Sequence, residues 1–465
     1  MQKNGYYIIM KGCIALNILV FSFSPKNETS ITYHSVLYLQ KIFKEDNFDI
    51  HLVGGKCSCT EDDGSAMEKA DLVMLISSLF HFSAPHQMML FLDDLYEKFG
   101  DIMKRKTFVF YTTSGKIMDI TIHGYVENYF NHHGLKYERS LSQFDCSILE
   151  EEGRAEIVRW FTYIKQHMSD DDVRFKDSKC KAVVFDLTDG SNARISKAAE
   201  NAEKALAEKG ANVSRVNLRD YKILGCNACY GCYTTCVCVL NKADELVKSF
   251  EDVMKDTDIV FYVGELHYGM LGPMHKAWLD RQVQFGRRPF FREKIFDFLL
   301  DTDGSTADDL NMFKIHTAAM GGFGGDVNCC IGDLNELDEH IRSAVLIYNN
   351  EMRHQQDFYG VGVDLKFKRL AVEIQNMAVK DYEYFKSTGA YKPVTVNPNI
   401  APVYSGEDSM RTKKGRLVPY RAVINDADTN IPDISVRTRI NGPMPLTEYV
   451  KPDTKKFGLF SKKSK

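Results

Sequence analysis

Short continuous apolar runs alternate along the chain with segments of helical periodicity. Such runs are typical of strands buried on both faces of a parallel sheet. The stretches "TYHSVLYLQKIFKED" and "RISKAAENAEKALAEKG" instead repeat apolar residues every three or four positions, as helices do. The predicted strands cover residues 14–23, 71–77, 106–114, 180–188, 258–264 and 313–322. This alternation predicts right-handed crossovers and a doubly wound α/β fold.

The two halves of the chain share the same order of elements. Each has a middle strand that leads into an aromatic loop with histidine, "SSLFHFSAPHQMMLFLDDL" and "GELHYGMLGPMHKAWLDR", and a later strand that ends in small residues, "TTSG" and "TAAMGGFGG". This similarity indicates an internal duplication. We therefore predict a domain over 1–168, an acidic linker over 169–179, a second domain over 180–393, and an irregular extension over 394–465 that wraps the body or a partner.

Composition and charge exclude several classes of partner. The 465 residues are 44% hydrophobic and 26% charged, with a net charge of -4, which gives no basic footprint for nucleic acid or for anionic membranes. No apolar run reaches the ~18 residues of a membrane span. The early run "KGCIALNILVFSFS" lacks a small-residue cleavage site and leads into a polar loop, so we interpret it as a strand. We expect a cytoplasmic protein whose 12 cysteines are thiols or metal ligands.

Polar loops follow the first predicted strand of each half. In open α/β sheets, ligands bind beside the carboxyl ends of the strands, and a helix that begins there offers free N–H groups to a phosphate. The loops "SPKNETS" and "DGSNARIS" both supply hydroxyls and a cation, Lys26 or Arg194. When either loop is taken alone, helix capping explains it better than phosphate binding does. Glycine is too sparse in the first loop for a dinucleotide fingerprint.

The stretch from residue 218 to residue 281 resembles the NADPH-dependent FMN reductase and iron–sulfur flavoprotein family, whose fold is flavodoxin-like. The resemblance is carried by the cysteine-rich loop "GCNACYGCYTTCVCVLNK", by Leu266–Tyr268 in place of a Pro-x-Tyr loop, and by Lys276 with Asp280–Arg281. In the first half, "FSFSPKNETSITYHSVLYLQ" and "TTSGKIMDITIHGYVENYF" are similar to the same superfamily. Over roughly residues 14–350, this resemblance implies two tandem flavodoxin-like units.

The resemblance implies that FMN binds in the second half, where the flavin carries the chemistry and no side chain acts as a catalytic acid or base. The implied phosphate contacts are Ser191, Asn192, Arg194 and Ser196. The implied ring contacts are His267, Tyr268, Gly269 and Met270 on one side and Ala318, Gly321 and Gly322 on the other. The first half lacks the Lys-x₃-Asp-Arg element, so we expect that half to have lost its flavin and to serve as a structural or dimerising partner.

The cysteine loop has the spacing of a metal centre. Cys226, Cys229, Cys232 and Cys238 form C-x₂-C-x₂-C-x₅-C, which resembles the motif of cluster-binding iron–sulfur flavoproteins and implies a 4Fe–4S cluster. Cys236 offers the competing spacing of bacterial ferredoxins, but the proline that usually follows is absent and the chain has no second such run. We therefore predict Cys238 as the fourth ligand. Free thiols and a tetrahedral zinc site remain alternatives. We expect Asp280 and Arg281 to form an ion pair at a helix end.

These observations predict a flavin-dependent oxidoreductase that uses FMN and a 4Fe–4S cluster. It takes electrons from NAD(P)H or a ferredoxin and passes them to a small acceptor such as a quinone, or to a redox carrier protein. Flavins of this superfamily commonly lie at a dimer interface, so the resemblance implies a homo-oligomer. The alternative is a non-enzymatic redox or metal sensor with degenerate flavin pockets, which is favoured by Leu266 in place of proline and by Lys242–Ala243 in place of an acidic pair.

Overall fold

The computed structural model describes residues 15–391, except 26, 55, 116–117, 145–146, 150, 170, 286–287, 289–293, 325–327 and 353–356. It also describes the short paired strands β13 (Ile424–Asn425) and β14 (Asp433–Ile434). Apart from those two strands, the predicted extension over 394–465 lies outside these residues. In the described part of the chain, no helix combines the length and the apolar character needed to cross a membrane.

The first half forms a parallel sheet with the strand order β2-β1-β3-β4-β5, and β6 pairs with β4. This is the order 2-1-3-4-5 of flavodoxin-like folds, whose ligands bind where the order switches between the first and third strands. The predicted strands over 14–23, 71–77 and 106–114 correspond to β1, β3 and β4. The strands are β1 (Asn17–Ser22), β2 (Asn47–Leu52), β3 (Leu72–Ser78), β4 (Thr107–Ser114), β5 (Lys136–Tyr137) and β6 (Leu141–Phe144).

The second half repeats this topology. Its parallel strands lie in the order β12-β11-β9-β7-β8, with the short β10 antiparallel to β9. The fold class of two tandem flavodoxin-like units is therefore confirmed by the strand order in both sheets. The strands are β7 (Lys181–Asp186), β8 (Asn212–Asn217), β9 (Ile259–His267), β10 (Met270–Leu271), β11 (Ile295–Asp301) and β12 (Asn328–Asp333).

One predicted strand is wrong. Residues 313–322 belong to a helix, α10 (Ala307–Gly324), and the strand in that place of the sheet is β11. A short apolar run does not distinguish a buried strand from a buried helix. A capping pattern marks the start of α10, because Thr306 Oγ1 accepts from the N–H of Asp309 and the Asp309 carboxylate accepts from the N–H of Thr306.

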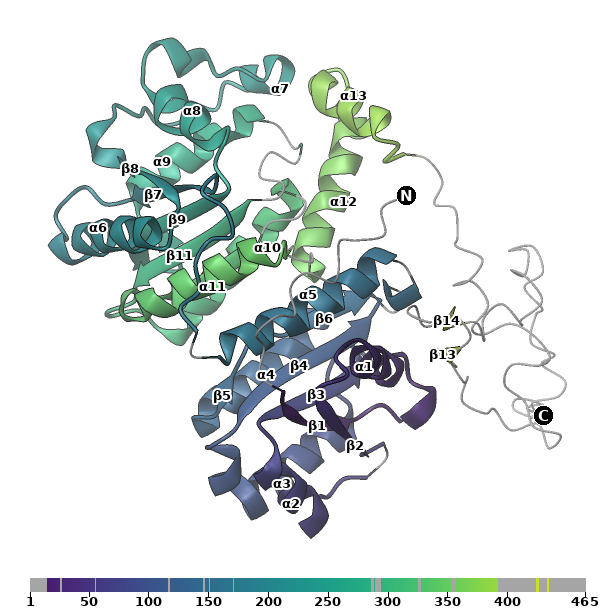
Figure 1. The fold of residues 1–465 in the computed structure, drawn as a ribbon. Helices are drawn as coiled ribbons and strands as arrows, with labels where there is room; N and C mark the ends of the chain where they lie inside the picture. The colour runs from purple at the N-terminus through teal and green to yellow at the C-terminus, as the bar shows by residue number, and fades with distance from the viewer. Residues whose placement is uncertain are drawn as a thin grey trace, which may run out of the picture.

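Helices cover both faces of each sheet (Figure 1). The first half contains α1 (Ile31–Ile42), α2 (Glu61–Lys69), α3 (His86–Met103), α4 (Asp119–His133) and α5 (Glu151–His167). The second half contains α6 (Ala193–Glu208), α7 (Gly231–Thr235), α8 (Asp252–Met254), α9 (Pro273–Arg281), α10 and α11 (Leu337–Asn349). After these follow α12 (Phe358–Glu373) and α13 (Val379–Ser387). Short turns of helix are η1 (Asn27–Thr29), η2 (Ser147–Leu149), η3 (Leu218–Asp220), η4 (Val239–Lys242), η5 (Val247–Glu251), η6 (Gln282–Phe285) and η7 (Leu334–Glu336).

The helices α12 and α13 connect the two halves (Figure 1). At one end, the N–H of Phe358 donates to Asp119 Oδ1, at the start of α4 in the first half, over 3.2 Å. At the other end, Lys380 Nζ donates to the carbonyl of Thr235 in the cysteine loop of the second half over 2.9 Å. The pair of helices therefore reaches from the carboxyl edge of the first sheet to the cysteine loop.

The two halves are joined along a seam between α5 and α11. One buried apolar cluster includes residues of both sheets and of both helices, among them Phe161 and Ile164 of α5 and Ile341 and Val345 of α11. The guanidinium of Arg342 on α11 also donates to the carbonyls of Gln166, Ser169 and Asp171, over 2.7, 2.5 and 2.7 Å. Apolar burial and these hydrogen bonds together fix the relative orientation of the two sheets.

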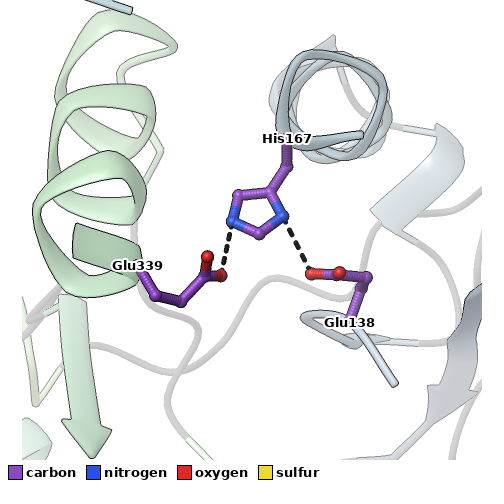
Figure 2. Close-up of side chains that lie close together, drawn as sticks. All are labelled: Glu138, His167 and Glu339. Carbon is purple, nitrogen blue, oxygen red and sulfur yellow. Dashed lines mark ion pairs between the residues drawn. The ribbon is translucent and has the colours of Figure 1, made fainter. Parts of the chain in front are cut away.

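An ion-paired histidine also bridges the seam (Figure 2). His167 at the end of α5 lies between Glu138, which follows β5, and Glu339 of α11. Its Nδ1 is 3.0 Å from one carboxylate and its Nε2 is 2.7 Å from the other. Because a metal ion takes one ring nitrogen and each ring nitrogen here faces a different carboxylate, the arrangement suits a protonated imidazole better than a metal ion. Burial lowers the pKa of His167, but the two carboxylates outweigh it and raise the pKa to about 9.

This bridge predicts a loss of stability at alkaline pH. The pKa of His167 is higher in the folded chain than in the unfolded chain, so the contribution of the bridge is complete below about pH 6.5 and is lost as the pH rises through about 9. After allowance for solvent screening, we expect a loss of about 1 to 2 kcal/mol. Urea unfolding at pH 7 and pH 10 measures it. His167→Gln should reduce the pH dependence, and an unchanged dependence in that variant would contradict the assignment.

Candidate functional site

The cysteine loop lies at the carboxyl edge of the second sheet, between η3 and η4, and contains α7. Cys226 and Cys229 are exposed, and Cys232, Cys236 and Cys238 are half-buried. Three residues of the loop, Ala228, Tyr230 and Cys236, have φ values of 52°, 57° and 56°. Left-handed conformations are unfavourable for side chains with a Cβ and tend to cluster at ligand-binding loops, where surrounding contacts hold them. The backbone of the loop therefore turns tightly around its cysteines.

The predicted ligands gather in this loop. The pKa of the Cys232 thiol is raised first by burial and then by the charges of Cys238, Cys226 and Cys229, so the sulfurs are close enough to influence one another. In the loop, which the structure describes completely, no three of these sulfurs lie within 4.8 Å of one another. A tetrahedral zinc ion with Zn–S bonds of about 2.3 Å needs sulfurs about 3.8 Å apart. The free thiols are therefore farther apart than zinc-bound sulfurs, and a cluster, a zinc ion and free thiols all remain alternatives for this loop.

A buried arginine holds both ends of the loop. Arg281, at the end of α9, donates from Nε to Cys238 Sγ over 3.0 Å and from Nη1 to the carbonyl of Leu224 over 2.9 Å. It also forms an ion pair with Asp244, and both side chains are fully buried. The expected ion pair of Asp280 with Arg281 is wrong. Neighbouring residues on a helix point in different directions, so Asp280 instead pairs with Lys276 one turn away on the exposed face.

The predicted phosphate loop of the second half follows β7, and its polar groups are already paired. Asn192 caps α6 by accepting from the N–H of Arg194, and the N–H of Ser191 donates to Asp189. The Arg194 guanidinium forms ion pairs with Asp301, at the end of β11, and with Asp303. The donors implied for a phosphate are thus engaged with carboxylates.

Asp186 organises the inner part of this loop. Its fully buried carboxylate accepts from Thr188 Oγ1 and Ser196 Oγ over 2.8 Å each, and from Arg219 Nη1 over 2.8 Å. Burial alone would raise the pKa of Asp186, but hydrogen bonds from Thr188, Ser196 and Arg219 lower it below its usual value. The hydroxyl of Ser196 therefore serves the loop's own carboxylate.

The expected ring contacts are only partly brought together. His267, Tyr268, Gly269 and Met270 form the turn between β9 and β10, where the Tyr268 side chain is 94% exposed. This turn lies against α10, since a Cβ on Gly269 would come within 2.7 Å of Met312 Cβ. Ala318, Gly321 and Gly322 lie on α10 and not in a loop after a strand, and the side-chain surroundings of the last two are outside the described residues.

The carboxyl edge of the first sheet carries different side chains from that of the second sheet. No site is predicted there from the sequence. Ser22 at the end of β1 and Thr113 near the end of β4 are buried, and within the described residues their hydroxyls have no hydrogen-bond partner. Ser30 precedes α1 without capping it, and its hydroxyl lies 2.6 Å from the Thr32 hydroxyl. Ser24 is also fully buried. Beside β1 and α1, this edge carries neutral hydroxyls and a helix start without a side-chain cap, whereas the buried carboxylate of Asp119 lies farther along it at the start of α4. The pattern "FSFSPKNETSIT" was the available signal.

Comparisons with known proteins find partial structural similarity. No family model matches the chain, and no curated protein matches it. An NADPH-quinone reductase from P. pentosaceus is 14% identical, covers 34% of this chain and 99% of its own, and has a TM-score of 0.27. A WrbA-like flavodoxin from Agrobacterium tumefaciens is 15% identical, with coverages of 33% and 100% and a TM-score of 0.25. A general stress protein 14 from Treponema denticola, solved in complex with FMN, is 10% identical, with coverages of 33% and 99% and a TM-score of 0.27.

The buried carboxylate predicts a stability effect. Asp186→Asn keeps the size of the side chain but places an amide donor among groups that already donate to it, so we expect a loss of about 2 to 3 kcal/mol in urea unfolding. Asp189→Asn is the matched control, because Asp189 is exposed and accepts the N–H of Ser191 at the loop surface. It should leave the free energy of unfolding nearly unchanged. Equal effects of the two substitutions would contradict the role of Asp186.

Proposed function

We propose that this chain is a flavin-dependent oxidoreductase that combines FMN with one 4Fe–4S cluster. It would take electrons from NAD(P)H and pass them to a quinone-like acceptor or a redox carrier protein. The observation that carries the proposal is the position of Cys226, Cys229, Cys232 and Cys238 on one tightly turned loop at the carboxyl edge of a sheet with flavodoxin-like strand order. Bound FMN would supply a two-electron acceptor for the hydride of NAD(P)H, and a cluster held by the four cysteines would supply one-electron transfer.

The cysteine loop fits a cluster. It offers thiol ligands, a backbone N–H from Ala228 to Cys226 Sγ over 3.4 Å, and the Arg281 donor to Cys238 Sγ. Hydrogen bonds to the sulfurs and partial burial are the features through which proteins adjust such clusters. Cys226 and Cys229 are exposed, which would leave that side of the cluster open to a carrier protein.

The polar loop after β7 in the second half, with its present pairing of side chains, does not fit the phosphate of FMN. A phosphate monoester carries a charge of about -1.5 to -2 at neutral pH, and it would meet the carboxylates of Asp186, Asp189, Asp301 and Asp303. The cation that would attract it, Arg194, is held by two of them. Displacing these pairs leaves buried charge without a partner, which is costly. The proposed contacts of Ser191, Asn192, Arg194 and Ser196 with FMN therefore lose their support.

The first half fits the phosphate better, so we place FMN there. Ser30 precedes α1 and Thr32 lies in its first turn, both are buried with their hydroxyls 2.6 Å apart, and the first N–H groups of α1 have no side-chain cap. The loop after β3 exposes Phe80 and Phe82, flat apolar side chains suited to a flavin ring. In this arrangement neutral donors would bind the phosphate and aromatic side chains would hold the ring, and a cluster in the second half would be a separate redox centre.

The alternative function is a redox or metal sensor without flavin. It is favoured by one observation, the carboxylates that fill the phosphate loop of the second half. Counting iron and flavin per chain in protein purified without oxygen separates the two functions. Protein with neither would contradict the proposed oxidoreductase.

The location of FMN can be tested with matched variants. Ser30→Ala combined with Thr32→Val removes two hydroxyls from the first half, and we expect FMN to bind at least about tenfold more weakly in a fluorescence titration. Ser191→Ala combined with Arg194→Gln is the matched change in the second half and should alter the affinity less than about twofold. The reverse result would return FMN to the second half.

The ligand set predicts a spectral difference between two cysteine substitutions. Cys229→Ala should remove the broad cluster absorption near 410 nm and leave the flavin bands near about 375 and 450 nm. Cys236→Ser should leave both, because Cys236 is not a proposed ligand. Iron content measured on the same samples checks the assignment, and a cluster that survives Cys229→Ala but not Cys236→Ser would contradict it.

A further inference from the structure

We propose that Arg281 is a positioning residue that raises the reduction potential of the cluster through its contact with Cys238. This inference rests on the proposed function, because it concerns the same cysteine loop. Cys238 differs from the other proposed ligands in receiving a charged side-chain donor, over 3.0 Å, whereas Cys226 Sγ accepts a backbone N–H.

The guanidinium binds the loop on both sides of its cysteines. Nη1 donates to the carbonyl of Leu224, before the first cysteine, and Nη2 donates to Asn241 Oδ1, after the last one, over 3.1 Å. The Asp244 carboxylate accepts from the N–H of Leu224 over 2.9 Å while it pairs with the guanidinium. Through one planar side chain, Arg281 therefore fixes the entry and the exit of the loop together with one sulfur.

Cys238 is also held through its backbone. Its N–H donates to Gln284 Oε1 over 3.1 Å, and the same oxygen accepts from Asn241 Nδ2 over 2.7 Å. The Gln284 side chain lies in η6, directly after α9, and the residue is 2% exposed. The backbone of Cys238 is thus held at the same end of α9 that carries the guanidinium. This anchoring restrains the distance between Cys238 Sγ and Arg281 Nε.

The effect on the potential follows from charge. Reduction of a bound cluster would add one electron, supplied in the titration by a chemical reductant such as dithionite, and would form or break no bond. The added negative charge is stabilised by a nearby cation and by an N–H donor to a ligand sulfur, and this stabilisation is greater where water is excluded. Asp244 opposes it, because its negative charge partly cancels that of the guanidinium. The two members of the buried pair should therefore shift the potential in opposite directions.

The experiment is a potentiometric titration of the full chain, purified without oxygen and followed by electron paramagnetic resonance of the reduced cluster. Arg281→Lys weakens the directed donor, and we expect a more negative potential. Asp244→Asn leaves the guanidinium uncancelled, and we expect a more positive potential. Lys276→Gln removes a cation from the exposed face of α9 and should leave the potential unchanged.

The outcomes separate this inference from the proposed function. Wild-type protein without iron would overturn the proposed function before any potential is measured. If the wild-type protein holds a cluster and Arg281→Lys or Asp244→Asn has the same potential as the wild type, the inference is overturned but the proposed function stands. Loss of iron from both of these variants, with native circular dichroism and normal iron in Lys276→Gln, would reduce the contact to a structural one and would also overturn the inference. A more negative potential in Arg281→Lys together with a more positive potential in Asp244→Asn would support the inference. If only one of the two variants retains iron, the expected shift in that variant would support it.

Discussion

The shared apolar core between α5 and α11 is the constraint on which the rest of the molecule depends. Each sheet is parallel and must be covered on both faces, and at the seam each half supplies part of the cover for the other. Neither half could expose that face to water without losing the burial of residues such as Phe161 and Ile341. The carboxyl edges of the two sheets therefore belong to one fixed framework, and chemistry at one edge can be coupled to chemistry at the other.

The duplicated units differ in the charge at the end of their first strand. The last residue of that strand is Ser22, a buried neutral hydroxyl, in the first half and Asp186, a buried carboxylate, in the second half. A buried carboxylate stays ionised only with strong donors, and here Arg219 and two hydroxyls serve it. The second half instead carries thiols on its next loop. One topology thus carries buried hydroxyls beside its first strand in one copy and a cysteine-rich loop after its second strand in the other.

The sequence predicts some levels of this structure much better than others. Apolar runs identified β1, β3, β4, β7 and β9, because strands buried on both faces leave a continuous signal. The same signal misassigned α10, where the capping pattern at Thr306 was the better guide. Cysteine spacing is local, so it could be recognised directly. The role of Arg281 could not, because its partners lie 57 and 43 positions away at Leu224 and Cys238 and meet only in the folded chain.

The α12 helix has a consequence for how this chain can change. Its 16 residues span about 24 Å, and the contacts of its first residue, Phe358, and of Lys380 in the following α13 join the first sheet's edge to the cysteine loop. Inserting or deleting one residue would rotate everything beyond it by about 100°, which would carry Lys380 away from the carbonyl of Thr235. The length of α12 is therefore more strongly constrained than the identity of its many half-exposed side chains. We expect its sequence to change by substitution and not by insertion or deletion.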